Sequence, residues 1–223
     1  MTFGDKVIDF YNNINQPIDV PADIKILNPF LNPAVSKVLK EFCHNYLSTK
    51  DKKVLIIGIN PGRFGAGVTG IPFTDPIRLR TDLGIKNNFE NKAELSSKFV
   101  YELIHKFGGV KCFYNQFYIT SVCPLGFTHN NKNINYYDSK ELQNSLKNYI
   151  VSSIKDHMNF GIDRSIAYSF GKGKNFKYLN DLNSKYGFFE KIIPLPHPRW
   201  VMQYRLKSKD KIIEEMVNCL NNP

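Results

Sequence analysis

Two residues of types that act in catalysis, Asn60 and His197, stand directly beside prolines. Pro61 biases Asn60 towards an extended backbone, and the Asn60 amide can both donate and accept hydrogen bonds. His197 has a proline on each side, in a segment that we expect not to form a helix, so that the direction of its ring is fixed. The alternatives are an ordinary turn asparagine and a structural loop histidine.

A glycine-rich segment surrounds Asn60, with glycines at positions 58, 62, 65, 67 and 70. The last three match the G-x-G-x-x-G pattern of dinucleotide-binding proteins. That pattern must open a helix, whereas we expect Ile71-Pro72-Phe73 to be extended, and no P-loop sequence is present either. We therefore expect a loop whose backbone a planar or bulky group can approach closely, the alternative being a flexible surface loop.

Four short apolar runs predict the strands that position these loops. They cover residues 53–59, 116–122, 164–170 and 191–196, and such runs are typical of strands buried on both faces. Apolar residues at helical spacing predict helices around 3–14, 35–46, 95–107, 142–154, 176–182 and 212–220. Asp138 and Glu141 have the spacing of a capping box, and residues 129–137 are expected to form an exposed loop.

Strands that alternate with helices predict a three-layer α/β/α sandwich around a short, four-stranded, mainly parallel sheet. We expect one domain over residues 1–223, with residues 1–50 as a helical N-terminal extension packed on it. The loops after the strands have unusual compositions: NPGRFGAG, CPLGF, GKGKN and HPRW. Because ligands bind at the carboxyl ends of parallel strands, we expect these loops to converge on one crevice.

The net charge of +10 and the pI of about 9.3 favour an anionic partner, most simply nucleic acid. Compositional drift is the alternative, since Lys and Asn are abundant throughout the chain. The arginines are more selective, because five of the six fall in or just after two of the unusual loops, and their planar forks suit phosphates. These five are Arg63, Arg78, Arg80, Arg199 and Arg205.

The composition disfavours several other classes of protein. The four cysteines are scattered without a C-x-x-C pair, which argues against a zinc or iron–sulfur site. We also expect no other metal site and no cofactor. The chain has no apolar run of about 18 residues, and its charged N-terminal sequence MTFGDKVIDF differs from a signal peptide. We therefore expect a cytoplasmic protein without a membrane span, and by default a monomer.

The sequence GINPGRFGAGVTGIPF, residues 58–73, resembles the first motif of the single-strand-selective monofunctional uracil-DNA glycosylases, within the uracil-DNA glycosylase superfamily. PHPRW is similar to their second motif, and SVCPLGF is similar to their central Cys-Pro-Leu segment. The resemblance is dense over residues 54–73 and thinner elsewhere, while the order of elements agrees over residues 33–220. It implies the fold of that superfamily and a DNA repair enzyme that flips a base out of the stack and hydrolyses its N-glycosidic bond.

The resemblance also implies roles for single residues. Asn60 would position the attacking water, and His197 would donate a hydrogen bond to the uracil O2 as negative charge builds there. Phe73 would stack on the flipped base, and a glycine at position 62 would leave room for a 5-substituent. The remaining expected contacts to the base come from Ile59, Gly62 and Ser121.

The expected DNA contacts lie outside this pocket. Arg199 and Trp200 fall where the family has its duplex-invading wedge, and the other candidates are Arg63, Lys172, Lys174 and Pro198. Two departures from the family pattern suggest a bacterial side branch. Ser121 stands where the family has a uracil-reading asparagine, whose paired contact a hydroxyl cannot reproduce. The second motif is also shorter and differently spelled.

We therefore expect a monofunctional, metal-independent glycosylase that removes uracil, and other deaminated or 5-modified pyrimidines, from single- or double-stranded DNA. The first alternative is a non-catalytic nucleic-acid-binding module of the same fold that stacks bases on Phe73 and Trp200. The second is an unrelated α/β enzyme acting on a phosphorylated small molecule. The presence of both Asn60 and His197 favours catalysis, because binding alone does not require them.

Overall fold

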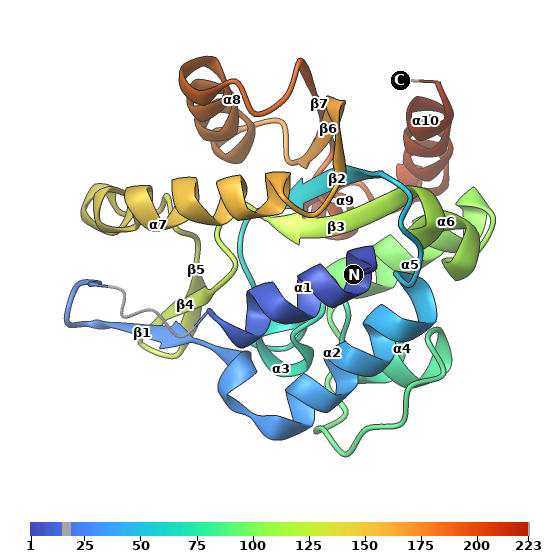
Figure 1. Ribbon diagram of the computed structural model, residues 1–223, viewed down its shortest axis with the longest axis horizontal. Coiled ribbons are helices and arrows are strands. Elements are labelled where there is room, and N and C mark those ends of the chain that lie inside the picture. Colours follow the sequence, from blue (N-terminus) through green and yellow to red (C-terminus); the bar gives the residue numbers. More distant parts are fainter. Residues whose placement is uncertain (15–18, 223) are drawn as a thin grey trace.

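In the computed structural model, which describes residues 1–14 and 19–222, four parallel strands form the central sheet in the order β3-β2-β6-β7 (Figure 1). The strands match the predicted apolar runs to within two residues at each end, which confirms the predicted sheet. Their bounds are β2 (Lys53–Gly58), β3 (Phe117–Ser121), β6 (Ile162–Phe170) and β7 (Lys191–Leu195).

Helices cover both faces of this sheet. On one face, Tyr168 of β6 donates a hydrogen bond to the Cys219 carbonyl in α10 (Lys209–Asn221) at 3.0 Å. On the other face, Thr120 of β3 is hydrogen-bonded to His157 of α7 (Lys140–Met158) at 2.9 Å. Tyr168 and Thr120 pair with consecutive residues of β2, whose side chains point to opposite faces. The predicted three-layer sandwich is therefore confirmed.

The helices fall into a predicted set and an unpredicted set. Those that match the predicted apolar spacing are α7, α10, α1 (Phe3–Asn12), α2 (Pro33–Tyr46), α5 (Leu95–Phe107) and α8 (Lys174–Tyr186). The others are too short to show a period: α3 (Ala66–Thr69), α4 (Pro76–Thr81), α6 (Val110–Gln116) and α9 (Pro198–Tyr204), with the 3₁₀ turns η1 (Pro29–Leu31) and η2 (Leu206–Ser208).

A small antiparallel sheet was not predicted. It consists of β1 (Ile24–Leu27), β4 (Gly126–His129) and β5 (Lys132–Ile134). Asn130 and Asn131 join β4 to β5 with φ values of 48° and 58°, a left-handed pair that asparagine tolerates in tight hairpins. The prediction of an exposed loop over 129–137 is therefore wrong in part: residues 130–133 are exposed, but they form a hairpin turn and the start of β5, and Tyr136 beyond them is buried.

The start of α7 also differs from the prediction. Ser139 caps the helix by accepting a hydrogen bond from the Leu142 N–H at 3.3 Å. Asp138 instead accepts one from the Asn135 N–H at 2.8 Å, so Asp138 and Glu141 do not form a capping box.

Residues 1–50 contribute α1 and α2 to the same hydrophobic core as the central sheet, and they add the strand β1. Residues 15–18 of the expected N-terminal extension lie outside the described residues, and the single-domain organisation stays a prediction. Within the described part of the chain, no helix is long and apolar enough to span a membrane.

Candidate active site

The loops that follow the parallel strands meet at the carboxyl edge of the central sheet. Residues after β2, β3 and β7 line a small cavity of about 90 Å³, which we call the pocket. Residues after β6 and β7 line a wider hollow of about 700 Å³, which we call the groove. Four residues line both hollows: Ile59, Asn135, His197 and Arg199. The pocket contains all of the predicted catalytic and base-binding residues: Ile59, Asn60, Gly62, Phe73, Ser121 and His197.

The carboxamide of Asn60 is held by backbone groups. Its Nδ2 donates to the Ile134 carbonyl at 3.2 Å and to the Pro61 carbonyl at 3.4 Å. Its Oδ1 accepts a hydrogen bond from the Tyr136 N–H at 3.0 Å. These partners fix which end of the amide is oxygen and use both amide protons. The second lone pair of Oδ1 remains, so Asn60 can only accept a further hydrogen bond.

The segment that holds Asn60 is anchored to the sheet through Tyr136. The buried Tyr136 Oη donates to Asn175 Oδ1 at 2.9 Å, and Asn175 Nδ2 donates to the Gly58 carbonyl at 3.4 Å. Gly58 ends β2 two residues before Asn60, so these hydrogen bonds close a ring around the catalytic candidate. Tyr136 and Asn175 were not predicted as site residues, and the one available signal in the sequence was the aromatic pair Tyr136-Tyr137 within a polar run.

His197 is the N-cap residue of α9, and the prediction that its segment would stay non-helical is wrong. Pro198 occupies the first position of this helix, where a missing N–H is tolerated, so the proline starts the helix. The Arg199 N–H donates to His197 Nδ1 at 3.1 Å, which leaves the proton of a neutral ring on Nε2.

The charge state of His197 follows from its surroundings. Burial, together with the nearby Arg199 charge, lowers the pKa of His197 to about 4. The ring is therefore neutral near pH 7, and its Nε2–H has no acceptor among the described residues. His197 thus lines the pocket as a neutral hydrogen-bond donor.

Phe73 has a left-handed backbone with φ of 53°, whereas an extended conformation was expected. This conformation is strained for a bulky residue and is held by the surrounding structure. The Phe73 ring packs edge-on against Phe170 at 5.1 Å and lies 6.1 Å from the His197 ring, measured between centroids. A Cβ atom at Gly58 would lie 2.7 Å from the Phe73 ring, so this glycine makes room for Phe73. Gly70 ends α3, which agrees with the rejection of the dinucleotide pattern.

Ser121 ends β3 and pairs in register with Gly58 at the end of β2. This residue is 8% exposed and lines the pocket. No described residue forms a hydrogen bond with its hydroxyl, which leaves that group available to a ligand.

Glu94 also lines the pocket, although it was not predicted as a site residue. It precedes α5 at the N-cap position without capping the helix through its side chain. Burial, and then the charge of Asp75, raise the pKa of Glu94 to about 7, although Arg199 acts in the opposite direction. The only signal in the sequence was that glutamate is an unusual N-cap residue.

The groove carries most of the residues predicted to contact DNA: Lys172, Lys174, Arg199 and Trp200. Trp200 is 43% exposed, and the Arg205 guanidinium lies 5.0 Å from its ring centroid. Arg63 is exposed over the Phe64 ring and Pro198 is buried, and neither of them lines the groove. The structure thus brings positive charge and an exposed aromatic ring to a groove that shares lining residues with the pocket.

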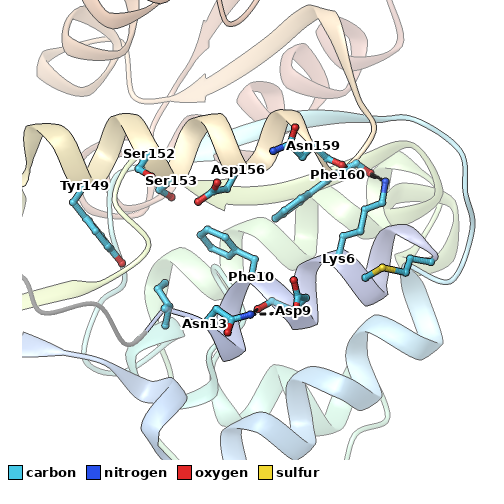
Figure 2. Close-up of a pocket in the computed structure, with 12 residues that line it drawn as sticks. Lys6, Asp9, Phe10, Asn13, Tyr149, Ser152, Ser153, Asp156, Asn159 and Phe160 are labelled. Carbon is cyan, nitrogen blue, oxygen red and sulfur yellow. Dashed lines mark hydrogen bonds between the residues drawn. The ribbon is translucent and has the colours of Figure 1, made fainter.

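A second hollow of about 400 Å³ lies between α1 and α7, away from these loops (Figure 2). Several of its polar groups bond to each other. Lys6 Nζ donates to the Asn159 and Phe160 carbonyls at 3.2 Å, and Asn13 Nδ2 donates to Asp9 Oδ1 at 3.1 Å. It contains none of the predicted site residues. Within the residues described, no cluster of His, Cys, Asp and Glu has the arrangement of a metal site.

Comparison with known proteins agrees with the sequence resemblance. A family model described as the Uracil DNA glycosylase superfamily matches residues 44–221. The chain is similar to the crystal structure of wild-type SMUG2 from Pedobacter heparinus, with 43% sequence identity, complete coverage of both chains and a TM-score of 0.96. No curated protein matches the chain.

Proposed function

The chain belongs to the uracil DNA glycosylase superfamily, and on that premise we propose that it removes uracil from DNA by hydrolysing the N-glycosidic bond. Its substrates would include other deaminated or 5-modified pyrimidines. The reaction would be monofunctional, with water as the nucleophile, and independent of metal ions. The base would enter the pocket after flipping out of the DNA, which costs a few kcal/mol in a duplex and less in a single strand.

The observation that carries this proposal is the opposite hydrogen-bonding character of the two catalytic candidates. Asn60 can only accept, which suits a water molecule whose oxygen must point a lone pair towards the sugar. His197 can donate from Nε2 to a base oxygen without transferring its proton, which suits a uracil that departs as an anion. Each such donor or acceptor is typically worth about 10²–10³ in rate.

Other pocket residues would hold the base. Phe73 would stack on the pyrimidine ring, and the unpaired Ser121 hydroxyl would make one hydrogen bond to its polar edge. No lysine lines the described pocket, which supports water over a Schiff-base nucleophile.

The groove supports DNA as the partner. Its lysines and Arg199 would contact phosphates, and Trp200 would stack on or wedge between bases. The alternative of a binding module without catalysis predicts the same groove, but it does not explain why backbone groups hold the Asn60 amide in one orientation.

A cleavage assay tests the proposal. A labelled oligonucleotide with one uracil, single-stranded or opposite G or A, is incubated with the protein in EDTA and then treated with hot alkali. Strand scission that appears only after alkali treatment, and that is lost in Asn60→Ala, is the expected result. No scission together with salt-sensitive DNA binding would favour the binding module.

A further inference from the structure

The carboxyl group of Glu94 fills a space that two glycines create. A Cβ atom at Gly65 would overlap Glu94 Oε2, and one at Gly62 would lie 2.9 Å from Oε1. Real Cβ atoms do not approach other atoms so closely, so a side chain at either position would displace the carboxyl group. The glycine expected to leave space beside the base therefore borders an acid.

This carboxyl group lacks the partners of a structural carboxylate. The Glu94 N–H donates to Asp75 Oδ2 at 2.9 Å, but within residues 1–14 and 19–222 nothing donates a hydrogen bond to the Glu94 side chain or forms an ion pair with it. The charged or titratable groups on the neighbouring elements are Asp75 before α4, Arg63 in the glycine-rich loop, and His197 and Arg199 at α9. His197 is neutral, and burial and then the Asp75 charge oppose ionisation of Glu94, while the Arg199 charge favours it less strongly, so that the pKa of Glu94 is raised overall.

Glu94 is half-buried, and a carboxyl group that is withdrawn from water without a donor partner is stabilised as the neutral acid, which carries a proton that it can donate. Among the groups that line the pocket, Glu94 therefore adds a donor on the side of Gly62. That is the side where the family resemblance places the C5 edge of the base, next to O4.

We propose that Glu94 is a specificity-determining residue, which as a neutral acid donates a hydrogen bond to the carbonyl oxygen on the edge of the flipped base beside Gly62. This inference rests on the proposed glycosylase function. The carbonyl oxygen of uracil accepts such a hydrogen bond, whereas the amino group of cytosine is itself a donor and does not. An ionised Glu94 would repel both that oxygen and the negative charge that develops on the departing base.

The test compares single-turnover uracil cleavage by the wild type and by Glu94→Gln between about pH 6 and about pH 9. The wild-type rate should fall about tenfold per pH unit above the Glu94 transition, because the donor proton is lost. The glutamine amide donates at every pH, so the variant should give a flat profile. Its rate should not exceed the wild-type rate near pH 6 and should be at least about tenfold higher near pH 8.5. His197 does not titrate in this range.

Glu90→Gln is the matched control, because Glu90 lies in the same segment, is exposed and pairs with Lys92. It should follow the wild-type profile. A Glu94→Gln profile that falls with the wild-type midpoint would overturn the inference, and so would a flat wild-type profile, which needs no variant. If the wild type cleaves uracil at no pH, the proposed function itself fails and the inference fails with it.

Discussion

At the scale of single residues, the contacts outside the pocket decide what each catalytic candidate can do inside it. Asn60 donates both amide protons to the carbonyls of Ile134 and Pro61, and His197 Nδ1 accepts a hydrogen bond from the Arg199 N–H. Asn60 is therefore an acceptor and His197 is a donor. The residue types alone leave both options open, since an amide and a neutral imidazole each contain a donor and an acceptor.

His197→Ala removes the neutral donor from the pocket. We expect the single-turnover rate of uracil cleavage to fall by about 10²–10³, while DNA affinity stays close to that of the wild type. His105→Ala is the control, since His105 is exposed and pairs with Asp82. A wild-type rate in His197→Ala would remove this residue from the mechanism.

Ser121→Asn tests how the pyrimidine edge is read. An amide at this position can donate and accept at once, so we expect the preference for uracil over other deaminated bases to rise about fivefold, as one added hydrogen bond allows. The measurement is the ratio of two cleavage rates, one on an oligonucleotide with uracil and one on an oligonucleotide with another deaminated base. An unchanged ratio would show that residue 121 does not read the base.

Glu94→Gln should also change stability in a pH-dependent way. The pKa of Glu94 is raised in the folded protein, so the native state binds this proton more tightly than the unfolded chain does. Wild-type stability should therefore decrease as pH rises from the ordinary glutamate pKa to about 7. We expect the variant to melt a few °C above the wild type near pH 8, with a smaller difference near pH 5. Equal melting temperatures at both pH values would show that Glu94 ionises without cost.

At the scale of elements, the segment between β5 and α7 positions Asn60 although it lies far away in sequence. Its contact to Asn60 joins residues 76 positions apart, and the Tyr136–Asn175 hydrogen bond ties it to α8. This segment and the β2 loop must therefore be assembled together before the site is complete.

Tyr136→Phe tests this element. The change leaves a buried Asn175 oxygen without its donor, which should lower the free energy of unfolding by about 1–3 kcal/mol. Because the segment loses its anchor, we expect the cleavage rate to fall more than DNA affinity.

Tyr178→Phe is the matched control for this change. The Tyr178 ring lies 5.2 Å from the Tyr136 ring, but its buried hydroxyl has no partner among the described residues. Its removal should therefore be neutral or stabilising. Equal effects of the two substitutions, measured by denaturant unfolding, would contradict the role of the Tyr136 hydrogen bond.

At the scale of the whole molecule, the net charge of +10 does not by itself locate a binding surface, but the positive side chains that line the groove do. Positive side chains after β6 and β7 lie beside the pocket, so phosphates bound there would bring a flipped base to its entrance. Arg80 takes no part in this arrangement, since its guanidinium is hydrogen-bonded to Asn87 and Asn91.

The double variant Lys172→Ala/Lys174→Ala should weaken DNA binding at low salt. If both lysines contact phosphates, the slope of log affinity against log salt concentration should become shallower by about 2. The rate at which bound substrate is cleaved should change little. Lys37→Ala on α2, an exposed lysine that does not line the groove, is the control. An unchanged slope in the double variant would show that Lys172 and Lys174 do not contact the DNA phosphates.

The sequence by itself determined the four strands of the central sheet, six of the helices and the edge of that sheet where Asn60 and His197 meet. These features depend on local signals: apolar runs, helical spacing, and the glycines and prolines that follow the strands. The same local signals gave wrong predictions where one residue type is compatible with two structures. Two asparagines fit both a loop and the β4–β5 hairpin turn, and a proline can either break a helix or start one, as it does in α9.

Only the tertiary structure decided which way the Asn60 amide points, which ring nitrogen of His197 donates, and that Glu94 enters the pocket. The Asn60 and Asn175 hydrogen bonds join residues 76 and 117 positions apart, and the Glu94 carboxyl fits because two glycines of another loop have no side chains. Such contacts depend on the packing of distant segments, which no pattern of neighbouring residues encodes.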